Sequence, residues 1–84
     1  MKIYLVQGFT GEWDDARGWT AKAFVKKAAA KAYMNKLDAI ITSFGDVTME
    51  NYSDLGDLLR EVDKYASADY TGVTYDIVPL LVTE

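Results

Sequence analysis

The sequence predicts an α+β fold, a two-layer sandwich in which a three-stranded antiparallel sheet packs on two helices in the order ββααβ. Three observations lead to this prediction. Strand-like runs stand near both ends of the chain, two stretches between them repeat apolar residues at helical spacing, and glycines separate several segments. The 84 residues are enough for one core, so we expect a single domain over residues 1–84.

Two strands are predicted in the first third of the chain. Residues 1–8 carry apolar side chains on both faces, which suits a central strand, and Gly8 is expected to end it. Residues 9–18 contain glycines and three acids, a composition typical of an exposed loop. Residues 19–25 alternate as a strand would, but their alanines and lysines also favour a helix, so the pattern alone leaves both open.

Two amphipathic helices are predicted next. The first begins at Lys26 and ends at Gly45, and its apolar stripe recurs every three or four residues at Ala29, Tyr33, Leu37, Ile40 and Phe44. The second carries its stripe at Leu55, Leu58, Leu59, Val62 and Tyr65, with Thr48, Ser53 and Asp54 as candidate N-caps.

The last predicted element is a β-branched and aromatic strand over residues 70–82. Pro79 has no backbone N–H to donate to a ladder. The strand is therefore expected at a sheet edge, or its pairing is expected to end near Pro79.

Charge is sorted along the chain rather than mixed. Residues 1–37 hold seven basic and three acidic side chains, a net +4, whereas residues 38–84 hold two basic and ten acidic ones, a net −8. Such asymmetry favours an electrostatic partnership with something basic. The chain has no cysteine and no histidine, so the thiol nucleophile, the commonest general base and the usual zinc ligands are missing. We expect no enzyme activity, no cofactor and no metal.

Several local clusters have an ordinary explanation. Glu12, Asp14 and Asp15 do not match the spacing of a calcium loop, so a solvated loop is favoured over a metal or acid–base site. Trp13 and Trp19 flank Arg17, which suggests either an aromatic cage for the cation or, preferably, two tryptophans sealing one end of the core. A solvated helix face is the favoured account of Lys22, Lys26, Lys27 and Lys31.

The sharper pattern is a row of acids spaced 4, 4, 3 and 4 residues apart: Asp46, Glu50, Asp54, Asp57 and Glu61. One helix through all five would align their carboxylates on one face, about 4.5–6 Å apart along the axis, a pitch comparable to that of phosphates along a DNA strand. An ordinary solvated face is the alternative, and a break at Thr48 or Ser53 would scatter the row. The predicted partner-binding set comprises these five residues together with Asp63 and Asp69.

One stretch carries a resemblance to a known group. The motif Gly8-x-Thr10-Gly11-Glu12-Trp13-x-Asp15-x-x-x-Trp19, followed by Ala23-Phe24 and an alanine-rich helix, resembles small proteins of bacteriophages and prophages. The late Tyr70-x-Gly72-x-x-Tyr75 is similar to their C-terminal strand. The resemblance implies a strand, not a helix, over residues 19–25, and it does not extend to the acids of the second helix.

Phage proteins of this size and acidity, without catalytic residues, are similar to anti-CRISPR proteins, many of which occupy the DNA-binding surface of an effector complex. We therefore expect a monomeric, acidic inhibitor in the host cytoplasm that binds a basic nucleic-acid-handling complex by DNA mimicry, with a type I CRISPR effector favoured. No direct contact with nucleic acid or membrane is expected. The alternative is an accessory or structural phage protein that self-associates through the Trp13 and Trp19 end and an edge strand at residues 73–77.

Overall fold

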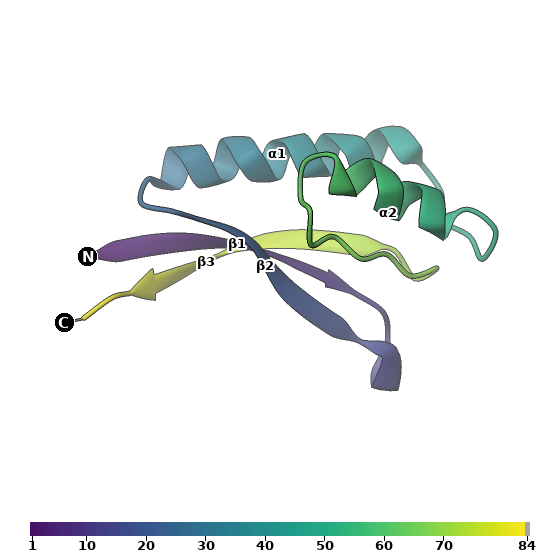
Figure 1. Ribbon diagram of the computed structural model, residues 1–84, viewed down its shortest axis with the longest axis horizontal. Coiled ribbons are helices and arrows are strands. Elements are labelled where there is room, and N and C mark those ends of the chain that lie inside the picture. The colour runs from purple at the N-terminus through teal and green to yellow at the C-terminus, as the bar shows by residue number, and fades with distance from the viewer. Residues whose placement is uncertain (84) are drawn as a thin grey trace.

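The computed structural model describes residues 1–83 and has the predicted α+β architecture in the order ββααβ. Three strands form one antiparallel sheet in the order β2-β1-β3, and both helices lie over one face of it, which leaves the other face uncovered (Figure 1). The elements are β1 (Lys2–Thr10), β2 (Arg17–Phe24), α1 (Lys27–Phe44), α2 (Tyr52–Arg60) and β3 (Val73–Leu81), with a short 3₁₀ turn at Trp13–Asp15.

The central strand is longer than predicted. Gly8 does not end it, because β1 continues to Thr10 and Gly8 pairs with both Trp19 and Tyr75. Glycine is required at this position by the packing of Trp19, since a Cβ at Gly8 would lie 2.3 Å from the indole ring. The alternation of β1 puts Val6 and Thr10 under the helices, whereas Phe9 is on the open face.

The sequence pattern of residues 19–25 fits either a strand or a helix. Most of these residues belong to β2, which confirms the strand. The first helix ends as predicted, at a Gly45 with the positive φ of 83° that favours glycine. The buried face of this helix starts one residue later than the predicted apolar stripe. Ala30 and Leu37 are buried, whereas Ala29 is exposed, because the contact with the sheet selects one alanine among several equivalent ones.

The second helix begins earlier and ends sooner than its apolar pattern suggested. None of the three predicted residues is the N-cap of this helix, which is Asn51. The Asn51 side chain stabilises the preceding loop. It accepts from the backbone N–H of Thr48 (2.7 Å) and donates to the carbonyl of Asp46 (3.1 Å). Leu55 and Leu59 enter the core, but Leu58 stays partly exposed. The chain leaves the helix at Arg60, so Tyr65 lies outside it and is exposed.

The final strand lies at a sheet edge, as Pro79 predicted, and pairs only with β1. The core lies between the helices and the covered face of the sheet. It consists of the buried apolar residues Val6, Ala30, Leu37, Leu55, Leu59, Ala66, Val73 and Tyr75. Two polar residues, Thr10 and Asp63, are buried with them, and both are hydrogen-bonded.

Candidate functional site

The acidic row does not lie on one continuous helix. Because α1 ends at Phe44 and α2 begins at Tyr52, Asp46 and Glu50 belong to the loop between the helices. The other three acids follow the helix: Asp54 and Asp57 lie in α2, and Glu61 is its C-cap. All five are exposed. The regular pitch of carboxylates expected from a single helix is therefore confined to the three acids from Asp54 to Glu61.

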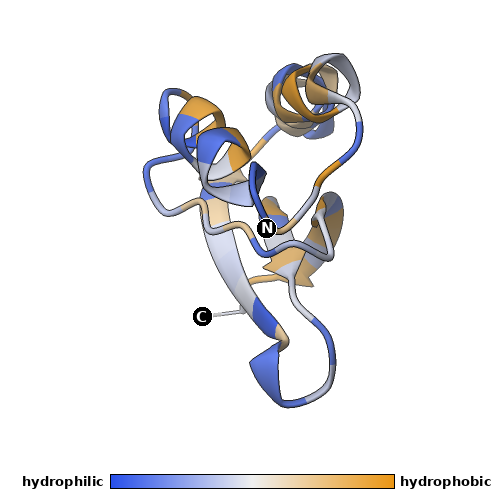
Figure 2. Ribbon diagram, turned by 90° about the vertical axis from the view of Figure 1, so that its right-hand side faces the viewer, coloured by the Kyte–Doolittle hydropathy of each residue, from blue (hydrophilic) through white to orange (hydrophobic). Residues whose placement is uncertain are grey.

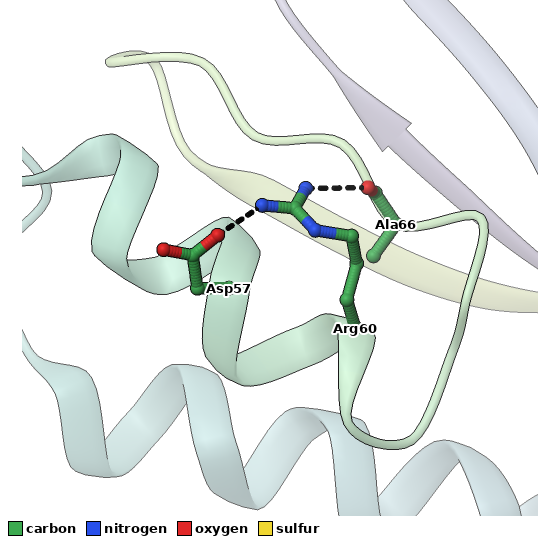
Figure 3. Close-up of polar contacts among 3 residues, drawn as sticks. All are labelled: Asp57, Arg60 and Ala66. Atoms are coloured by element: carbon green, nitrogen blue, oxygen red, sulfur yellow. Dashed lines mark hydrogen bonds and ion pairs between the residues drawn. The ribbon is translucent and has the colours of Figure 1, made fainter.

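One acid of the row is paired with a cation. The Arg60 guanidinium contacts the carboxylate of Asp57 and also donates to the carbonyl oxygen of Ala66 at 3.1 Å, so the arginine links α2 to the following segment (Figure 3). This is the only ion pair among residues 1–83. The acidic face of α2 thus includes a positive charge and is less negative than the sequence suggested.

The prediction that Asp63 belongs to the partner-binding surface is wrong. Asp63 is only 1% exposed. Its Oδ2 accepts from Trp19 Nε1 (2.8 Å) and from the hydroxyl of Tyr75 (2.9 Å), and its Oδ1 accepts from the backbone N–H of Tyr65 (3.0 Å). The segment after α2 turns inward at this point, so the carboxylate is a structural acceptor for three donors.

The buried carboxylate also affects two tyrosines. Burial raises the pKa of the Tyr75 hydroxyl, and the hydrogen bond to Asp63 and the negative charge of that carboxylate raise it further. Burial likewise raises the pKa of Tyr33, with a smaller contribution from Asp63. Both hydroxyls therefore stay protonated at neutral pH and act as donors, Tyr75 to Asp63 and Tyr33 to the carbonyl of Val62 (3.0 Å).

Asp69, the last predicted binding residue, is half-buried. Its carboxylate accepts from the backbone N–H of Tyr70 at 2.7 Å, and its own N–H donates to Thr10 Oγ1 at 2.9 Å. The Thr10 hydroxyl in turn donates to the carbonyl of Gly72 at 2.6 Å. These bonds attach the segment before β3 to the end of β1.

A second set of bonds holds the same segment to the β1–β2 turn and to the start of β2. The Gly11 N–H donates to Thr71 Oγ1 (3.1 Å), and Arg17 donates to Ser67 Oγ through Nε (2.9 Å) and Nη2 (2.6 Å). The aromatic cage proposed for Arg17 is therefore not formed, because the guanidinium bonds to a hydroxyl instead. These bonds hold the two ends of the β1–β2 turn against the segment that contains Asp69.

Acids from three segments gather at one end of the molecule. The β1–β2 turn, the loop between the helices and the segment before β3 all lie at the end of the long axis opposite the two termini (Figure 1). The β1–β2 turn projects away from the helices and is strongly hydrophilic (Figure 2). We call this the acidic end. Its members are the exposed acids of the turn and the loop, Asp54 in the first turn of α2 and the half-buried Asp69: Glu12, Asp14, Asp15, Asp46, Glu50, Asp54 and Asp69.

The contribution of the β1–β2 turn was not predicted, because Glu12, Asp14 and Asp15 were counted in the basic first part of the chain. The signal that would have placed them is the glycine-rich turn between two adjacent strands, which must lie at one end of the sheet. Lys2 and the first turn of α1, with Lys27, lie at the opposite end (Figure 1). The acidic end therefore draws on both parts of the chain, and the basic Arg17, at the start of β2, lies beside it.

The two tryptophans have different environments. Trp19 is partly buried and contacts Tyr75 edge-on with ring centroids 6.0 Å apart, so it seals the core as predicted. For Trp13 that prediction is wrong: its side chain is 91% exposed, at the tip of the β1–β2 turn. Large exposed aromatic residues are common anchors in protein interfaces.

The open face of the sheet has a hollow of about 390 Å³ that the sequence analysis did not anticipate. Strand pairing explains its shape. Phe9 pairs with Gly18 on one side and with Thr74 on the other, and Gly18 has no side chain to fill the space beside the ring. The side chains around it come from all three strands: Gln7, Phe9, Thr20, Thr74, Asp76 and Val78.

Two kinds of site are absent from the described part of the chain. Residues 1–83 contain no group of three acidic, histidine or cysteine side chains arranged to hold a metal ion. They also contain no helix of the length and apolarity needed to cross a membrane.

Comparison of the chain with protein-family models, with curated proteins and with solved structures gives no match in any of the three. A function for this chain is therefore proposed from its geometry and charge and from the resemblance of its motif at residues 8–19 to small phage proteins.

Proposed function

We propose that this protein is a small inhibitor, encoded by a phage or another mobile element, that docks its acidic end on a basic surface of a nucleic-acid-handling host complex. A CRISPR effector, with type I favoured, is the partner class we propose. The observation that supports the proposal is the gathering of carboxylates from separate segments at one end of the molecule, all of them exposed except the half-buried Asp69. Such a surface fits a groove lined with lysine and arginine.

The charge distribution also favours rapid encounter. A concentrated negative field at one end, with positive charge at the other, orients the molecule as it approaches a basic surface and raises the association rate. The same attraction is screened by salt, over a Debye length of about 8 Å at physiological ionic strength. Binding should therefore weaken steeply as salt is added.

The mechanism we propose is competition by charge and steric overlap. A row of five evenly spaced carboxylates is not available as a copy of the DNA backbone, because the loop at residues 45–51 interrupts it. Asp54, Asp57 and Glu61 keep helical spacing, but of these three only Asp54 belongs to the acidic end, where the β1–β2 turn adds further negative charge. Mimicry of DNA is thus proposed at the level of charge density rather than of regular phosphate spacing.

The test is capture of a nucleoprotein complex from native host lysate, with the variant Asp46→Asn, Glu50→Gln, Asp54→Asn compared with wild type. These three residues are exposed, and within residues 1–83 their carboxylates take part in no hydrogen bond or ion pair. The matched control, Lys26→Gln, Lys27→Gln, Lys31→Gln, removes three charges from the opposite, exposed end.

We expect the acidic-end variant alone to lose capture of the complex and inhibition of its DNA binding. We also expect moderate salt to elute the complex that the wild-type protein has captured. A folded acidic-end variant that captures and inhibits like wild type would overturn the proposal.

A second candidate function is favoured by the exposed Trp13 and by the uncovered sheet face, which bears Leu80 and Val78. An accessory phage protein could self-associate through these apolar residues. Sedimentation at low and high salt separates the two candidates. Apolar self-association persists at high salt, whereas the proposed inhibitor stays monomeric in both.

A further inference from the structure

The hollow on the open face of the sheet combines an aromatic ring with a carboxylate. Phe9 is 51% exposed and borders the hollow from the central strand. Asp76 borders it from β3, two residues along from Thr74, which pairs with Phe9. Diagonal neighbours of this kind lie about 7–8 Å apart, within reach of one ligand group between them.

Asp76 has an uncommitted oxygen. Its Oδ1 accepts from the backbone N–H of Ile77 at 2.9 Å, and the one ion pair within residues 1–83 does not involve it. Asp76 is exposed, and the alternation of β3 puts it on the face opposite the buried Tyr75. The carboxylate is therefore available to a positively charged ligand at the rim of the hollow.

Polar groups complete the lining. Gln7 lies between Thr20 and Asp76 in the sheet, and its Nε2 donates to Thr20 Oγ1 at 3.4 Å. This leaves the amide oxygen of Gln7, the residue that pairs with Asp76 across the strands, as an acceptor. The hollow therefore offers one negative charge, neutral acceptors and an exposed ring face, with Gly18 leaving the space open.

We propose that this hollow binds the guanidinium group of an arginine side chain on the partner protein. A guanidinium is planar, so it can stack on the Phe9 ring and donate two N–H groups toward the Asp76 carboxylate at the same time. The ammonium of lysine lacks a flat face and would use the ring and the carboxylate less well. The inference rests on the proposed function in one respect, since the arginine belongs to the same basic partner.

The test is an NMR titration of the full ¹⁵N-labelled chain with three blocked tripeptides that differ only at the central residue: arginine, lysine or citrulline. Citrulline keeps the planar shape of arginine but carries no charge. We expect saturable shifts at the amides of Phe9, Gly18 and Asp76 with the arginine peptide, weaker shifts with lysine and none with citrulline. Shifts that map to the loop at residues 45–51 instead, or that citrulline reproduces, would overturn the inference.

Two variants assign the roles of the ring and the charge. Asp76→Asn and Phe9→Leu alter exposed side chains, and circular dichroism establishes that each variant is folded. We expect Asp76→Asn to weaken arginine-peptide binding about tenfold and Phe9→Leu to abolish the preference for arginine over lysine. The control Asp38→Asn removes the same charge from α1, over the opposite face of the sheet, and should leave peptide binding unchanged. An equal loss in the control would show only a general charge effect and reject the site.

The two proposals fail separately. If the arginine peptide does not bind but the acidic-end variant still loses capture of the host complex, the hollow is rejected and the proposed function stands. If the peptide binds at the hollow but the acidic-end variant captures normally, the proposed function is rejected while the arginine site remains.

Discussion

Trp19 and Asp63 are 44 positions apart in the sequence and are joined by a hydrogen bond of 2.8 Å from the indole Nε1 to Oδ2. The bond connects an edge strand of the sheet to the turn that follows α2. The same oxygen accepts from Tyr75 on the other edge strand, so one buried carboxylate ties both edges of the sheet to the helical layer. We expect this bond to matter more for stability than any surface charge.

Replacing Asp63 by alanine should lower the free energy of unfolding by about 3 kcal/mol, because one buried and two partly buried donors would lose their common acceptor. Urea denaturation followed by tryptophan fluorescence measures the loss. Asp54→Ala is the matched control, since this carboxylate is exposed and its removal should change stability by less than about 0.5 kcal/mol. Equal losses of stability in the two variants would show that the hydrogen bonds of Asp63 stabilise the fold no more than an exposed carboxylate does.

Gly8→Ala should destabilise the fold by about 1–3 kcal/mol, because the added Cβ would lie 2.3 Å from the Trp19 ring and the indole would have to move. Gly18→Ala is the comparison on the neighbouring strand, where the nearest atom to an added Cβ is 3.3 Å away. We expect a smaller loss there. Thermal unfolding measures the stability of both variants. A Gly18→Ala variant less stable than Gly8→Ala would contradict the role of Gly8 in the packing of Trp19.

Stability should decline at alkaline pH. The pKa of Tyr75 is raised in the folded state, so the folded chain holds this proton more tightly than the unfolded chain does. This contribution is fully present below the unfolded pKa of about 10 and is lost as the pH rises above it. Urea denaturation between pH 8 and about 11 should show the decline.

The variant Tyr75→Phe tests the origin of that decline. It removes the hydrogen bond to Asp63 and lowers stability at neutral pH, but it should also make the alkaline decline shallower. The raised pKa of Tyr33 leaves a residual slope in the same direction. An alkaline decline as steep in the variant as in wild type would assign the effect to other groups.

Arg60→Ala should cost about 1 kcal/mol, mainly through loss of the bond to the Ala66 carbonyl, which is partly buried. Asp57→Ala removes only the exposed ion pair with Arg60 and should cost less than about 0.5 kcal/mol. Hydrogen exchange of residues 61–72 gives an independent measure, since the arginine holds this segment to α2 (Figure 3). Faster exchange in the Asp57 variant than in the Arg60 variant would reverse the assignment.

The elements of the fold were predictable because they depend on local pattern. Gly45 and Pro79 set a helix end and an edge strand, and both predictions are confirmed. The phase of α1 was predicted less well, since alanines such as Ala29 and Ala30 are equivalent until the sheet covers one of them. The end of β1 was missed because Gly8, which looks like a strand terminator, instead accommodates the ring of Trp19.

The candidate site was predicted only in part. Charge spacing singled out Asp46 to Glu61 but could not show that a loop divides them. Nor could spacing separate the buried Asp63 from its exposed neighbours, because its burial depends on donors far away along the chain. The hollow beside Phe9 and Asp76 was missed for a similar reason, as three strands contribute to it.

By itself the sequence determined the elements, their order and the excess of acids in the second part of the chain, because periodicity, glycines, proline and charge act over a few residues. Tertiary structure alone decided which acids are available to a partner. Pairing of β1 with β2 carries Glu12 to the end where Asp46 lies, and packing of the segment after α2 buries Asp63. Burial and proximity arise from contacts between distant segments, and local pattern does not record those contacts.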